Sequence, residues 1–133
     1  MNHALTPILA ASIFLPLPAL SDTIKINCLL HSKHIEAAQD SSKKESTINF
    51  SYHHRDHSAV MVVDGDRKIA NVHKGSSGVS FIVFEEDGGV STTSVSTDGF
   101  AAHFSTRLNK DGVNETFMTG NCETQILADK SER

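Results

Sequence analysis

The stretch from residue 75 to residue 108 constrains the fold more than any other part of the chain. Three runs rich in β-branched and aromatic residues are separated there by Asp-Gly pairs at 87–88 and 98–99. Asp-Gly between such runs is typical of a tight turn between antiparallel strands. The stretch therefore predicts a three-stranded antiparallel meander.

The last run of this stretch alternates between apolar and polar positions. Phe100, Phe104 and Leu108 fall on one side of an extended chain, whereas His103 and Arg107 fall on the other. This alternation indicates a strand with one buried face. We expect the phenylalanine side to be buried and His103 to lie on the exposed polar side.

The rest of the chain supplies further strands and no persistent helical periodicity. The additional strands are expected at 23–30, 48–52, 58–63, 67–73 and 115–122. The polar segment 31–46 has the composition of a loop, with one or two helical turns at 34–39, and 123–133 is a polar tail. About eight short strands with regular turn signals predict an all-β single domain, a small antiparallel barrel or sandwich.

Residues 1–21 have the features of a secretory signal peptide. Positions 7–20 carry no charge, and Ala19 and Ser21 provide a small-x-small cleavage site. Pro16 and Pro18 interrupt an apolar run that is too short to span a membrane. We expect cleavage before Asp22, a domain at 22–133 in the periplasm or outside the cell, and no membrane span in the mature form.

The charge balance and motif content narrow the function. The chain has 12 Lys and Arg against 16 Asp and Glu, a formal charge of −4, and no basic cluster that could offset phosphates. This argues against nucleic acid as a partner. A nucleophile elbow and a paired-carboxylate motif are both missing, so we expect a binding module rather than an enzyme, with no cofactor.

Two cysteines, Cys28 and Cys122, lie near the two ends of the predicted domain. An even pair in a small exported domain is usually a structural disulfide. A redox-active pair normally has Cys-x-x-Cys spacing, which is absent here. We expect a bridge that ties the first strand to the last.

Three histidines, His53, His54 and His57, cluster within five residues. Imidazole suits zinc, copper or nickel, so a periplasmic metal-binding protein is the alternative function. The cluster lies between two predicted strands, where a solvated hairpin turn is expected. His31 and His34 would complete a metal site only if the fold brought them near.

Residues 58–68 followed by 75–81 resemble the periplasmic and membrane-bound inhibitors of c-type lysozyme. The resemblance implies a small exported β-barrel whose Ser-Gly-x-x-Tyr loop enters the lysozyme cleft. It places Ser77 and Gly78 in the binding loop, with Phe81 in place of the tyrosine. The second half of the chain, including 97–103 and 120–122, is similar to exported proteobacterial proteins without an assigned function.

The partner implied by this resemblance is a secreted protein such as a lysozyme. We expect the contact surface to comprise residues 75–80 and the turn at 86–89, with Ser77, Gly78 and Glu86 as contacts and Phe81 pointing inward. The family carries a lysine on the following strand, where this chain has Glu85 and Glu86. Because glutamates repel the catalytic carboxylates of a lysozyme, a more basic target is favoured by charge.

Overall fold

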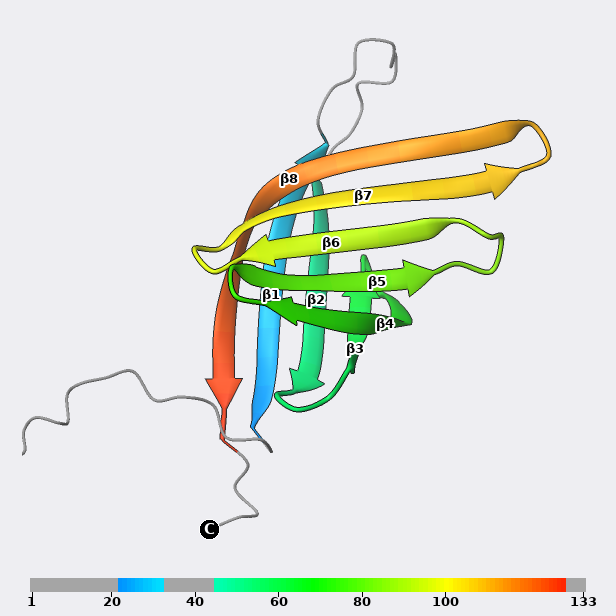
Figure 1. Ribbon diagram of the computed structural model, residues 1–133. Helices are drawn as coiled ribbons and strands as arrows, with labels where there is room; N and C mark the ends of the chain where they lie inside the picture. The colour runs from blue at the N-terminus through cyan, green and yellow to red at the C-terminus, as the bar shows by residue number, and fades with distance from the viewer. Residues whose placement is uncertain (1–21, 33–44, 129–133) are drawn as a thin grey trace, which may run out of the picture.

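The computed structural model describes residues 22–32 and 45–128, and their regular structure is entirely β-strand. Eight strands follow one another round a closed antiparallel barrel, in which the first strand also pairs with the last (Figure 1). The strands are β1 (Thr23–Ser32), β2 (Glu45–His53), β3 (Ser58–Val63), β4 (Asp66–Gly75), β5 (Gly78–Phe84), β6 (Val90–Ser96), β7 (Phe100–Asn109) and β8 (Gly112–Leu127). This confirms the all-β prediction and decides for a barrel over a sandwich.

Strand bounds agree with the sequence pattern in the middle of the chain and differ at its end. The predicted tail after residue 122 begins as strand, because β8 continues to Leu127, which pairs with Thr23 of β1. The predicted signal peptide and the helical turns at 34–39 lie outside the described residues. In the described part, no helix is long and apolar enough to cross a membrane.

The core fills the middle of the barrel with inward side chains from all eight strands. Phe81 is fully buried, its ring stacks on that of Phe50 at a centroid distance of 3.8 Å, and Tyr52 packs edge-on against it. Such ring pairs stabilise a core beyond the area that they bury. Phe81 therefore points inward, as predicted.

β7 has the opposite orientation to the one that its apolar alternation predicts. Ala101 and His103 are buried, whereas Phe100 and Phe104 are 52% and 43% exposed. The interior of a small barrel has a limited volume, and the cross-strand row that holds His103 also holds Phe81, whose ring is stacked on Phe50. The small Ala101 and the hydrogen-bonded His103 fit inward, so the phenylalanines point out.

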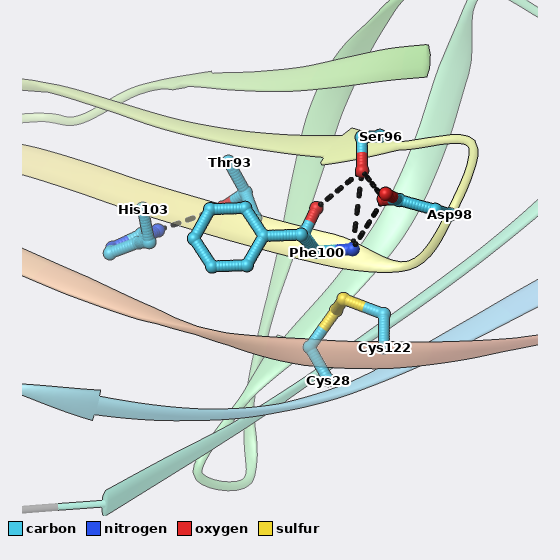
Figure 2. Close-up of a disulfide and its surroundings, with 7 residues drawn as sticks. All are labelled: Cys28, Thr93, Ser96, Asp98, Phe100, His103 and Cys122. Carbon is cyan, nitrogen blue, oxygen red and sulfur yellow. Dashed lines mark hydrogen bonds between the residues drawn. A yellow bond between two sulfur atoms is a disulfide. The ribbon is translucent and has the colours of Figure 1, made fainter. Parts of the chain in front are cut away.

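A disulfide closes the barrel covalently. Cys28 of β1 and Cys122 of β8 are directly opposite one another in the ladder, with their Cα atoms 4.0 Å apart, and their sulfur atoms are bonded (Figure 2). The predicted bridge between the first and last strands is confirmed. Disulfides persist in oxidising compartments and are rare in the reducing cytosol.

Candidate functional site

The antiparallel meander places the turns at two opposite ends of the barrel. The β3–β4, β5–β6 and β7–β8 turns lie at one end, which we call the β5–β6 end. The β2–β3, β4–β5 and β6–β7 turns lie at the other, which we call the β4–β5 end. Each candidate residue can therefore be assigned to one end.

Ser77 and Gly78 belong to a tight turn at the β4–β5 end. Only two residues separate Gly75 from Gly78, which are paired, and the carbonyl of Ser77 accepts a 3.0 Å hydrogen bond from the Thr97 amide of the next turn. A Cβ on Gly78 would overlap the carbonyl oxygen of Val95. The turn is held against the barrel and is not the elongated loop that the inhibitor resemblance implies.

Glu86 lies at the other end of β5 from Ser77. The strand between them has seven residues, which at about 3.3 Å per residue separates the two by roughly 20 Å. Ser77 and Gly78 line a shallow hollow on the outside of the barrel, together with Phe100, and Glu86 does not. The expected single surface from residues 75–80 and 86–89 is thus split between two ends.

The histidine cluster forms the β2–β3 turn, closed by a 2.9 Å hydrogen bond from the Asp56 amide to the His53 carbonyl. His53 and His57 are exposed. Among residues 22–32 and 45–128, no group of three or more histidine, cysteine, aspartate or glutamate side chains could hold a metal ion. The prediction that this turn is not a tight metal site can be tested by zinc titration of tag-free protein.

A charged pair lies just inside the barrel at the β5–β6 end. The Lys68 ammonium contacts both carboxylate oxygens of Glu85, at 2.9 and 3.2 Å, and the Ser91 hydroxyl donates to the same carboxylate at 3.0 Å. The Glu85 side chain is only 15% exposed. Glu85 is therefore committed to an internal ion pair and is not the repulsive surface charge that the sequence suggests.

His103 lies deeper in the barrel beside this pair. Its Nδ1 atom is 2.7 Å from the Thr93 hydroxyl (Figure 2). Burial lowers the pKa of His103 below its usual value, while Glu85 raises it and Lys68 lowers it again. The prediction of an exposed His103 is wrong, because it rested on counting phenylalanine as the inward side of β7.

The hairpin formed by the end of β7 and the start of β8 projects past the β5–β6 turn (Figure 1). Leu108 and Val113 form a cross-strand pair near its tip and are 39% and 59% exposed. The tip itself carries Lys110 and Asp111, both exposed. The described part of the chain thus presents exposed apolar side chains on a projecting hairpin, as protein-binding loops commonly do.

Asp87 ties this hairpin to the β5–β6 turn at Arg107 and Leu108, just before its tip. One carboxylate oxygen accepts a 2.8 Å hydrogen bond from the Gly89 amide, and the other contacts the Leu108 amide at 3.3 Å and the Arg107 guanidinium at 3.5 Å. The hydrogen bond from Gly89, followed by those from Leu108 and Arg107, lowers the pKa of Asp87. The hairpin is therefore anchored at Leu108, and the exposed residues 109–112 form its tip beyond that point.

The β7–β8 hairpin was not among the sites predicted from the sequence, although a signal for it is present. The Asn-Lys-Asp-Gly turn at 109–112 has apolar residues on both sides, Leu108 and Val113. Whether this hairpin projects depends on how far the neighbouring strands extend, and the periodicity of the sequence does not predict that length.

Neither a protein-family model nor a curated protein matches this chain. The function must therefore be inferred from the residues of the barrel itself.

Proposed function

We propose that this protein is an exported, non-enzymatic binding module that contacts a partner protein through the projecting β7–β8 hairpin. The observation that carries the proposal is the exposed pair of Leu108 and Val113 beside the tip. Isolated apolar side chains on a surface need no explanation, but a cross-strand pair at the end of an anchored projection is suited to entering a cleft. The signal-like segment 1–21 and the disulfide support export to the periplasm or the outside of the cell.

Charge favours a basic partner. Lys68 and Arg107 are paired with Glu85 and Asp87, respectively. The exposed acids near the hairpin, Glu86, Asp111 and Glu115, then outnumber the exposed Lys110 at its tip. Opposite charge on the partner would steer the encounter and favour the correct orientation.

The sharpest form of the proposal is inhibition of a secreted enzyme, and the resemblance of residues 58–68 and 75–81 makes a c-type lysozyme the first target to test. In this form the main contact is the β7–β8 hairpin at the β5–β6 end. Ser77 and Gly78 are at most secondary contacts, because their turn lies at the β4–β5 end. Lysis of a lysozyme substrate is measured with an excess of the protein lacking residues 1–21. Inhibition that Leu108→Ser and Val113→Ser together weaken at least about 10-fold supports the hairpin as the contact.

Leu29→Ser is the matched control, because Leu29 is similarly exposed, at 47%, on β1. If Ser77→Ala abolishes inhibition and the hairpin variants do not, the contact lies at the β4–β5 end and the hairpin proposal fails. If neither the native protein nor the Glu86→Lys variant inhibits lysis, the proposal of a c-type lysozyme as target is rejected. The binding module itself is then tested by crosslinking.

A further inference from the structure

The outward surface of β5, β6 and the first seven residues of β7 carries no charged side chain. Charged residues make up 21% of the chain, yet the segments 78–84, 90–96 and 100–106 contain only one ionisable residue, the buried His103. We call the outward surface of these three segments the uncharged face. Depletion of charge together with exposed aromatic side chains is the compositional mark of an interface core.

One row with three large apolar side chains, interrupted by Thr92, crosses the uncharged face at right angles to the strands and continues onto β8. Ile82 of β5 is opposite Thr92 of β6, Thr92 is opposite Phe104 of β7, and Phe104 is opposite Phe117 of β8. Phe104 and Phe117 are exposed, and Ile82 is partly exposed. We call the row of Ile82, Phe104 and Phe117 the ridge, which is lower at Thr92 between Ile82 and Phe104.

The neighbouring row consists of small side chains. Ser80 is opposite Ser94, Ser94 is opposite Ala102, and Ala102 is opposite Thr119. Ser80, Ser94 and Ala102 line the outer hollow described above. The row is therefore a trough, and it lies two residues along each strand from the ridge, a spacing of roughly 7 Å.

We propose that a second copy of this chain covers the uncharged face in a two-fold dimer, with the ridge of each copy in the trough of the other. A two-fold contact uses the same patch on both subunits and so needs a self-complementary patch. Ridge and trough side by side on one face meet that need. A two-fold axis that runs parallel to the two rows and midway between them places the ridge of each copy over the trough of the other.

Charge also favours a second copy as the occupant. Each copy has a formal charge of −4, so two copies repel one another over most of their surfaces, whereas the uncharged face is the part on which they can approach without that cost. The dimer does not depend on the function proposed for the hairpin.

The experiment is light scattering coupled to size-exclusion chromatography on the protein lacking residues 1–21, over a range of concentrations. We expect the mass of a dimer. Phe104→Glu should give a monomer, with the dissociation constant raised at least about 100-fold because the new charge would be buried unpaired. Leu29→Glu, at a similarly exposed position on β1, should leave the dimer intact.

A charge-exchange pair tests the ridge-to-trough register directly. Phe104→Glu and Ala102→Lys are each expected to be monomeric, and an equimolar mixture is expected to form a heterodimer, because the ridge of one copy faces the trough of the other. Circular dichroism and thermal unfolding check that each variant is folded. A monomeric native protein at the highest soluble concentration, or a dimer that persists in Phe104→Glu, would overturn the proposal.

Discussion

At the scale of single residues, two kinds of position should affect stability most. At one the backbone leaves no space for a side chain, and at the other a polar side chain is buried away from water. Gly78 lies so close to β6 that the carbonyl oxygen of Val95 occupies the space of a Cβ. His103 is 7% exposed and holds its hydrogen bond to Thr93 inside the barrel. A change at either position is therefore expected to alter the free energy of unfolding of the barrel.

Gly78→Ala should lower the free energy of unfolding by about 1–3 kcal/mol, because β5 and β6 must move apart to admit the methyl group. Urea denaturation measures the change. Gly75→Ala is the matched control in the same turn, since the nearest atom to a Cβ there is 3.8 Å away. Equal stability of the two variants would show that the close approach at Gly78 is relieved at no cost.

Stability should fall as the pH drops below about 6.5, the ordinary pKa of histidine. Burial lowers the pKa of His103 in the folded state, so the unfolded chain takes up the proton first, and the stability present above pH 6.5 is lost as the pH falls toward the folded pKa. Glu85 and Lys68 are the charges that act on this ring, with opposite effects.

Urea denaturation between pH 5 and pH 8 measures this dependence. His103→Gln should flatten it relative to the native protein, since glutamine can still bond to Thr93 and carries no titrating proton. The exposed histidines are common to both proteins and cancel in the comparison. Identical slopes in the two proteins would contradict the assignment to His103.

At the scale of elements, the β5–β6 end combines an internal ion pair with an anchored hairpin. Strand existence was largely predictable from sequence, because turn pairs such as Asp87-Gly88 mark the ends of strands directly. The inward side of β7 was not predictable. Phe104 is the more apolar residue, but His103 has a hydrogen-bond partner inside the barrel, Thr93. Strand length was also hidden: β8 continues to Leu127 only because β1 lies beside it.

Lys68→Met should destabilise the barrel by about 1–3 kcal/mol, because it leaves the Glu85 carboxylate largely buried beside Ser91 without its cation. The double variant Lys68→Met with Glu85→Gln should recover most of that loss, since no charge then remains unpaired. A double-mutant cycle in urea measures the coupling. Additive losses would mean that the two side chains do not interact in solution.

At the scale of the whole molecule, pairing of β1 with β8 and the Cys28–Cys122 disulfide close the barrel at the same place. Closure was predictable in part: two cysteines at the ends of an all-β domain indicated a tie between the terminal strands. The direct opposition of the two cysteines and the projection of the β7–β8 hairpin depend on register, which the sequence pattern leaves open.

Replacing both cysteines with serine should lower the free energy of unfolding by about 2–5 kcal/mol. The native protein should contain no reactive thiol under denaturing, non-reducing conditions. Two reactive thiols per chain in protein recovered from its native compartment would mean that the disulfide does not form there.

The most direct test of the proposed function is site-specific photocrosslinking in the exported fraction of the native host. A photoreactive residue is placed at Val113 in one protein and at Ser77 in another, on the full-length chain. We expect Val113 to give a discrete adduct with a different protein, weakened by Leu108→Ser, and Ser77 to give no adduct with a different protein. An adduct with a different protein from Ser77 alone, or from neither position, would contradict the assignment of the hairpin as the binding surface.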